Sequence, residues 1–198
     1  MNILKDYISA EFTVKGSRFL SELFPCESQA EAKELIKAQK SKYSDATHVV
    51  HAFVTGLSME ILGMSDDGEP SGTAGRPALD VLKGHGCTNL LLTVTRWFGG
   101  TLLGTGGLVK AYGDGAKQVL LAADEAGLFE EYVKKIPFIF ECDYTLYQAA
   151  KRFLESLSVS ELEENFGTAV KVSGKVPESE YNLLCSKLKD LSNGKIIL

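Results

Sequence analysis

The sequence is poor in cysteine, and the cysteines it has are far apart. Cys26, Cys87, Cys142 and Cys185 are separated by 61, 55 and 43 positions, so no C-x-x-C pair is present. Such a pair is the usual sequence signal of a zinc or thiol redox site. Because free cysteine is among the most buried residue types, we expect four reduced, mostly interior thiols. Neither a metal nor a cofactor is predicted.

Long apolar runs are also missing. No stretch approaches the ~20 consecutive apolar residues of a membrane-spanning helix. The opening residues, MNILKDYISAEF, carry charged and polar side chains where a secretory signal would need an apolar run. The sequence thus predicts a cytoplasmic protein without membrane association, and 44% hydrophobic residues are enough for a packed core.

An excess of positive charge is the third absence. The formal net charge is -5, with 12 basic and 15 acidic residues before Gly127 and 9 and 11 after it. This balance argues against a strongly basic nucleic-acid-binding protein. A local cluster of basic side chains and backbone N–H groups can still bind a phosphate.

What the sequence does contain is an alternation of strand and helix patterns typical of an α+β protein. In residues 1–129 we expect a hairpin over 7–25, a capped amphipathic helix over 28–42, a strand over 47–54, a short helix from Pro77 to about Gly86, a buried strand over 89–98 and a long helix over about 105–123. In the predicted strand 47–54, His48 and His51 point to opposite faces and cannot share a metal.

Residues 134–198 predict a second, smaller domain. Strands over 135–143, 159–166, 168–176 and 195–198 alternate with helices over 144–157 and 178–191. This βαββαβ order is the ferredoxin-like pattern. Only the short stretch 127–133 remains as a linker.

Glycine is concentrated in one block. Thirteen of the 19 glycines lie between Gly63 and Gly115. Glycine inside helices and strands costs stability relative to alanine, so a specific requirement must retain it. The candidates are positive φ angles and the close approach of a ligand or another backbone.

The second half of this block is the stronger candidate for an anion site. A strand end there passes through glycines into a helix, which offers free N–H groups and a helix N-terminus to a phosphate. The candidate ligand residues are Arg76, Arg96, Gly99, Gly100, Gly104, Thr105, Gly106, Gly107 and Lys110. The spacing matches neither a Walker A loop nor G-x-G-x-x-G. The alternative is structural: the glycines permit close packing, and Arg96 pairs with Asp66 or Asp67.

The first half of the block is an acidic loop over 65–77. Asp66, Asp67 and Glu69 are oxygen ligands, but their spacing is not that of a calcium loop. A role for Asp67 or Glu69 in capping the backbone N–H groups that follow them is the simpler interpretation. Asp67 and Glu69 as acid or base, with His48 assisting, are the candidate catalytic residues.

Two strings carry a family resemblance. Asp66-Asp67-Gly68-Glu69-Pro70 with Gly72-Thr73-Ala74-Gly75, and Arg96 with Gly99-Gly100 and Leu103-Gly104-Thr105-Gly106-Gly107-Leu108, resemble the signature of the IMPACT/YigZ family. The likeness spans about 15–125, with Lys15, Ser17, Arg18, Phe19 and His48, and residues 134–198 resemble the small domain of the bacterial members.

The resemblance implies a first domain with the topology of ribosomal protein S5 domain 2 and a second like the last domain of elongation factor G. It also implies an association with RNA or the translation machinery, since eukaryotic relatives regulate translation under stress by competing for a partner of a kinase.

Three functions follow as hypotheses. The first is a non-enzymatic translation- or stress-associated regulator that binds RNA, a nucleotide or another phosphate-containing ligand, the ribosome, or a translation-factor partner through the glycine block. The second is an enzyme acting on a phosphorylated or peptide-like small molecule. The third is a protein-interaction adaptor in which the glycine block is structural.

Overall fold

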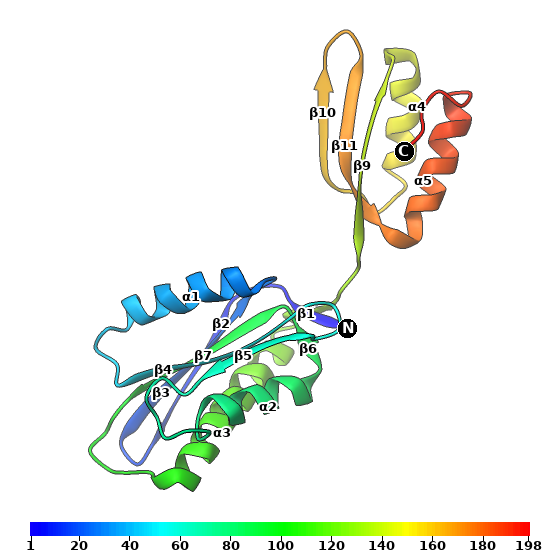
Figure 1. The fold of residues 1–198 in the computed structure, drawn as a ribbon. Helices are drawn as coiled ribbons and strands as arrows, with labels where there is room; N and C mark the ends of the chain where they lie inside the picture. Colours follow the sequence, from blue (N-terminus) through cyan, green and yellow to red (C-terminus); the bar gives the residue numbers. More distant parts are fainter. The chain divides into compact units, whose positions relative to one another are not determined.

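The computed structural model describes residues 1–198. The chain folds as two compact units, Met1–Tyr132 and Val133–Leu198 (Figure 1). Both units combine helices with antiparallel sheet, which confirms the α+β class expected from the sequence.

The first unit is built on a five-stranded antiparallel sheet in the order β2-β3-β7-β4-β5. Its strands are β2 (Ile8–Val14), β3 (Ser17–Pro25), β7 (Leu90–Trp97), β4 (His48–Thr55) and β5 (Ile61–Ser65). A separate small sheet joins β6 (Cys87–Thr88), β1 (Asn2–Leu4) and β8 (Phe129–Glu131).

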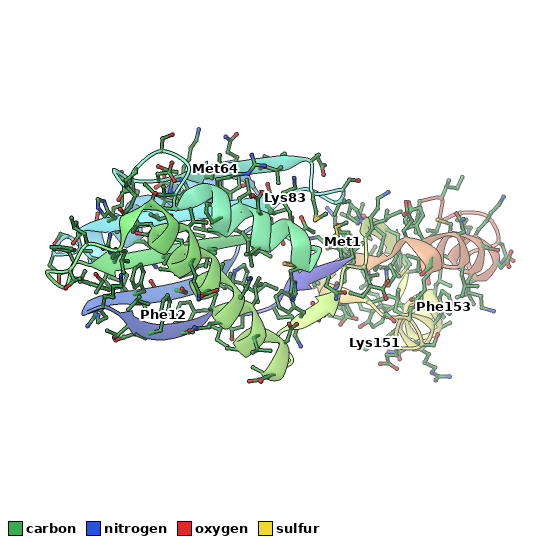
Figure 2. All side chains as sticks on the ribbon, turned by 90° about the horizontal axis from the view of Figure 1, so that it is seen from below. Met1, Phe12, Met64, Lys83, Lys151 and Phe153 are labelled. Atoms are coloured by element: carbon green, nitrogen blue, oxygen red, sulfur yellow. The ribbon has the colours of Figure 1, made fainter.

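Three helices cover the two faces of the large sheet. Helix α1 (Gln29–Lys42) lies on one face, and α2 (Gly75–His85) and α3 (Gly104–Glu125) lie on the other (Figure 1). Figure 2 shows α2 and α3 side by side across that second face. Ser28 caps α1 by accepting a hydrogen bond from the Glu31 backbone N–H at 3.2 Å, as the capping-box pattern predicted.

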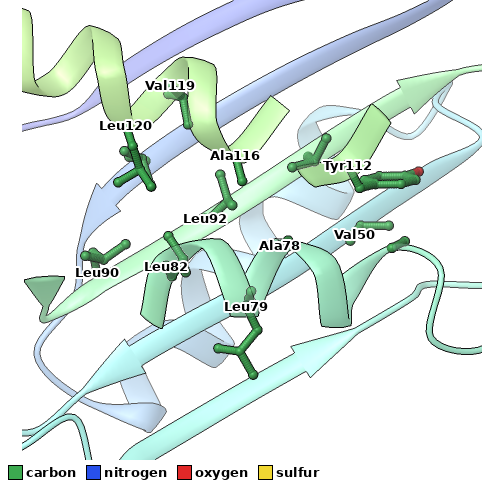
Figure 3. Packing of buried hydrophobic residues seen from close by; sticks show 14 of the residues in the cluster. Val50, Ala78, Leu79, Leu82, Leu90, Leu92, Tyr112, Ala116, Val119 and Leu120 are labelled. Carbon is green, nitrogen blue, oxygen red and sulfur yellow. The ribbon is translucent and has the colours of Figure 1, made fainter. Parts of the chain in front are cut away.

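The main core fills the space between the sheet and the α2–α3 pair. Buried side chains of β4 and β7, such as Val50 and Leu92, face Leu82 of α2 and Ala116 of α3 (Figure 3). The one tyrosine of this layer, Tyr112, is fully buried on α3.

The short strands β1, β6 and β8 were not predicted from the sequence, and helix α2 and strand β5 also differ from the expectation. Helix α2 begins at Gly75 instead of Pro77, because the Asp66 carboxylate binds the N–H groups that open it. Strand β5 was not predicted, since Gly63 lies in its centre. That glycine pairs with Phe53 of β4, and an added Cβ would lie 2.1 Å from the Phe53 ring. Aromatic packing, not a ligand, requires glycine there.

The second unit contains a three-stranded antiparallel sheet in the order β10-β11-β9 with two helices. The elements are β9 (Lys135–Cys142), α4 (Tyr144–Leu154), β10 (Ser160–Phe166), β11 (Val170–Pro177) and α5 (Glu178–Leu191). Lys151 and Phe153 on α4 are labelled in Figure 2.

The expected sixth element of this unit, a strand over 195–198, is absent. The backbone N–H of Ile196 instead donates to the Ser192 hydroxyl at 2.9 Å. Ile196 is nevertheless buried in the core of the unit. The C-terminal segment thus covers the core without joining the sheet.

Candidate functional site

A buried ion pair lies where β7, β4 and the acidic loop meet. The register places Arg96 of β7 directly beside His48 of β4. The Arg96 Nη1 donates to Glu69 Oε1 at 2.6 Å, and only 6% and 4% of the two side chains are exposed. Arg96 Nη2 also donates to the Ser17 hydroxyl at 3.3 Å. The charge of Arg96 is therefore neutralised inside the protein.

This pairing corrects one expectation. The structural alternative named Asp66 or Asp67 as the partner of Arg96, but the partner is Glu69. Arg96 is thus not a free counter-charge for a ligand. A buried ion pair of this kind needs further hydrogen bonds to offset the cost of desolvation.

Tyr112 supplies one of these bonds. Its hydroxyl donates to Glu69 Oε1 at 2.8 Å. Burial, together with the charge of Glu69 and the hydrogen bond to it, raises the pKa of Tyr112 far above the usual range. The phenol therefore stays a neutral donor, and Glu69 Oε1 is fully occupied.

The two aspartates of the acidic loop have structural roles. Asp66 accepts hydrogen bonds from the N–H groups of Gly72, Ala74 and Gly75 at 2.8–3.0 Å. Burial raises the pKa of Asp66, but these three donors outweigh it and hold the pKa below the ordinary value. Capping therefore belongs to Asp66, and not to Asp67 or Glu69 as expected.

Asp67 is the second structural aspartate. Its carboxylate accepts from the backbone N–H of Val49 at 2.7 Å and pairs with Lys40 of α1. This leaves Asp67 poorly placed to act as an acid or base, and it does not line the pocket described below.

His48 has a defined tautomer. Its Nδ1 lies 2.7 Å from the backbone carbonyl oxygen of Asp67. Because a carbonyl can only accept, Nδ1 carries a proton, and in the neutral ring Nε2 has a free lone pair. That Nε2 lies 3.9 Å from Glu69 Oε1. The ring is therefore held by the loop, with one nitrogen available.

A pocket of about 400 Å³ opens over this polar centre. Apolar side chains form much of its wall beside His48, Glu69 and Arg96. It is lined by Thr47, His48, Glu69, Pro70, Arg96, Phe98, Leu102, Leu103, Gly104, Thr105 and Leu108.

The N-terminus of α3 forms one side of this pocket. No side chain accepts a hydrogen bond from its first turn, and no acidic residue lies there. The N-terminus of α2 differs, since the Asp66 carboxylate occupies it. The first N–H groups of a helix without a cap require water or a ligand.

The structure brings five of the predicted site residues together around the pocket: His48, Glu69, Arg96, Gly104 and Thr105. Gly106 and Gly107 follow in the first turn of α3, outside the lining. Gly99 and Gly100 lie in the preceding loop, also outside it. An added Cβ on Gly99 would lie 1.9 Å from the Gly16 backbone, so Gly99 serves the packing of the loop on the first hairpin.

Two of the predicted basic residues lie elsewhere. Arg76 is exposed on α2 and pairs with Asp80 at 2.9 Å. Lys110 is exposed on α3, two residues beyond Leu108 of the pocket lining. Neither contributes positive charge to the pocket wall.

Three contributors were missed in the sequence. Phe98 and Leu102 lie in the loop before α3, and 82% of Leu102 is exposed. Large apolar residues inside a glycine-rich loop were the available signal. Tyr112 lies on α3, and its signal in the sequence was a lone phenol in a stripe of aliphatic side chains.

Other reactive groups do not form a second centre. No group of three or more His, Cys, Asp or Glu side chains converges in an arrangement that could hold a metal. Burial raises the pKa of Cys26 to about 11 and that of Cys87 to about 12. None of the helices combines the length and apolar character that crossing a membrane requires.

Comparisons with known proteins give matches over nearly the whole chain. Residues 15–120 match the model of the Impact N-terminal domain, and residues 140–195 match a domain of unknown function, DUF1949. An "IMPACT family member" of Haemophilus influenzae is 33% identical, covering 98% of this chain and 93% of its own length. "IMPACT family member YigZ" of Escherichia coli is also 33% identical, with 93% and 90% covered.

A solved structure agrees with these matches. A crystal structure described as that of a hypothetical protein has a TM-score of 0.71 and 31% identity, and the match covers 98% of this chain and 93% of the other.

Proposed function

The chain belongs to the IMPACT family, and from this premise we propose that it is a non-enzymatic, translation-associated protein that binds an RNA segment at the pocket beside Gly104. The family resemblance implies the link to translation. The observation that carries the site is the uncapped N-terminus of α3, which borders a pocket of about 400 Å³.

A phosphate is the ligand group that suits this helix end. The macrodipole places about half a positive charge at the N-terminus, and the free N–H groups point outward. Gly106 strengthens the argument. It lies in the first turn without a positive φ, and an added Cβ would meet nothing within 4 Å. No internal packing requires this glycine, whereas a ligand lying close to the backbone would favour it.

The apolar wall of the pocket suits a nucleotide base. Phe98 and Leu102 are exposed at the pocket, and nucleotide bases stack on aromatic side chains without a sequence preference. The volume is within the range of small-molecule sites and holds a single nucleotide unit.

The charge balance limits the number of phosphates. The net charge is -5 and Arg96 is neutralised by Glu69, so one or two phosphate contacts are expected. Each contact to single-stranded RNA contributes about -0.7 to the slope of log affinity against log salt. A slope shallower than about -1.5 is therefore the expected signature.

The proposal is tested with Gly106→Ala and a matched control in the same helix, Gly113→Ala. Both positions leave room for a methyl group, so each variant should gain up to about 1 kcal/mol of stability. Fluorescence anisotropy of a labelled single-stranded RNA should show weaker binding to Gly106→Ala alone. Equal RNA binding by both variants and wild type would contradict a site at this turn.

The second candidate is an enzyme acting on a phosphorylated or peptide-like small molecule. The observation in its favour is His48, whose Nε2 lone pair is available while Nδ1 is fixed by Asp67. Prolonged incubation of a panel of nucleotides and phosphorylated metabolites with wild type and with His48→Phe, followed by phosphorus NMR, discriminates the two. Turnover of a panel member by wild type alone supports the enzyme, and an unchanged panel together with RNA binding supports the binding protein.

A further inference from the structure

Two hydrogen-bond acceptors on the pocket wall lack a donor. The first is His48 Nε2, since Nδ1 carries the proton that Asp67 accepts. The second is Glu69 Oε2. Both donors that reach Glu69, Arg96 and Tyr112, bind Oε1, and Oε2 is not sealed from solvent. Both residues line the pocket.

The neighbourhood of these acceptors selects the kind of donor. His48 Nε2 lies 3.9 Å from the occupied oxygen of Glu69, Oε1, so a single donor group in the pocket can lie within reach of both Nε2 and the second oxygen of the same carboxylate. The charge of Glu69 is already offset by Arg96 at 2.6 Å. A cationic donor therefore gains little from this site, whereas a neutral hydroxyl meets acceptors that are otherwise unpaired.

We infer that the 2′-hydroxyl of an RNA nucleotide donates a hydrogen bond that His48 Nε2 and Glu69 Oε2 share, so that the pocket selects RNA over DNA. The 2′-hydroxyl is the group by which a protein distinguishes the two, and carboxylates bind ribose hydroxyls in other nucleotide sites. This inference rests on the proposed RNA site, with the phosphate at the first turn of α3 and the sugar over the polar centre.

The experiment compares three oligonucleotides of one sequence: RNA, 2′-O-methyl RNA and DNA. The methyl ether can accept but cannot donate, whereas DNA lacks the oxygen without adding a methyl group, so a loss common to both analogues reports the missing donor. We expect wild type to bind RNA about tenfold more tightly than either analogue, as the loss of one hydrogen bond to a buried acceptor implies.

Variants assign the preference to the acceptors. His48→Phe should bind all three oligonucleotides alike, and Glu69→Gln, which replaces an acceptor by a donor, should do the same. His51→Phe is the matched control because His51 lies on the opposite face of β4 and does not line the pocket. It should retain the full preference.

The outcomes separate this inference from the proposed function. Equal affinity of wild type for all three oligonucleotides overturns the hydroxyl contact but leaves the phosphate site intact. A preference that persists in both His48→Phe and Glu69→Gln overturns the assignment to these residues. Absence of binding to every oligonucleotide overturns the proposed function and this inference with it.

Discussion

At the residue scale, the first unit depends on a buried polar centre built around one ion pair. Glu69 Oε1 accepts hydrogen bonds from Arg96 and Tyr112, and the Ser17 hydroxyl accepts one from Arg96 Nη2. The Nε of Arg96 is buried without a partner. The centre therefore combines a structural ion pair with two acceptors that face the pocket.

The first prediction concerns this ion pair. Arg96→Leu leaves the Glu69 carboxylate buried and unpaired, and should lower the free energy of unfolding by about 3 to 5 kcal/mol. The double variant Arg96→Leu/Glu69→Leu should be more stable than Arg96→Leu alone, because it removes both charges. Urea unfolding measures the free energies of unfolding of the single and double variants. Additive losses from the two single variants would show that the pair does not couple.

At the element scale, α1 covers a row of polar groups on the sheet. Glu22, Thr93 and His51 are neighbours across β3, β7 and β4. Glu22 accepts from Tyr43 at the end of α1 at 3.0 Å. Glu22 Oε2, Thr93 Oγ1 and His51 Nδ1 are nevertheless buried without partners. The interface under α1 is thus less completely bonded than the α2–α3 side.

The second prediction is a pH dependence of α1. Burial lowers the pKa of His51, the charge of Lys40 lowers it further, and Asp67 opposes them. Below the ordinary histidine pKa of about 6.5, the unfolded chain binds more protons than the folded one. The free energy of unfolding therefore decreases as the pH is lowered, until His51 also protonates in the folded state. The protection factors of the α1 amides, which correct for the intrinsic pH dependence of hydrogen exchange, should fall from pH 7.5 to 5.5.

His51→Phe is the control for this effect, since it cannot titrate. It should remove most of the pH dependence of the protection factors in α1. A fall of the same size in His51→Phe would assign the effect to other groups.

The sequence predicted most helices and strands, but not all of them, and the elements show why. Hydrophobic periodicity indicated α1, α3, β4 and β7 well. It could not indicate β5, because Gly63 is dictated by Phe53 across the sheet, a contact that appears only after folding. The strand over 195–198 was wrong because one hydroxyl, that of Ser192, takes the N–H it needed.

The candidate site was predicted only in part, because several of its contacts also form only after folding. Motif spacing indicated Glu69, Arg96 and the first turn of α3, which the fold brings to one pocket. It did not indicate that Arg96 pairs with Glu69, or that Tyr112 binds the same oxygen. These contacts depend on the register of β7 against β4 and on the path of the acidic loop.

At the scale of the whole molecule, the acidic net charge and the family membership agree with a selective site of few contacts. Long-range attraction to nucleic acid is weak at a net charge of -5. We propose that the RNA is presented by a ribosome or a translation factor. Its high effective concentration there would compensate for the weak affinity of a site with few contacts.

The central claim is that an RNA phosphate binds at the first turn of α3, and a single pair of variants tests it. Thr105 is exposed in that turn. Thr105→Glu places a negative charge there, which favours the helix by about 0.3 to 1 kcal/mol but repels a phosphate. Thr105→Gln has nearly the same shape without the charge.

The measurement is the anisotropy of a labelled single-stranded RNA titrated with both variants, with melting temperatures recorded alongside. We predict that Thr105→Glu melts no lower than wild type and loses RNA binding by tenfold or more, about 1.4 kcal/mol, while Thr105→Gln binds as wild type does. Equal RNA affinity of the two variants would contradict the account.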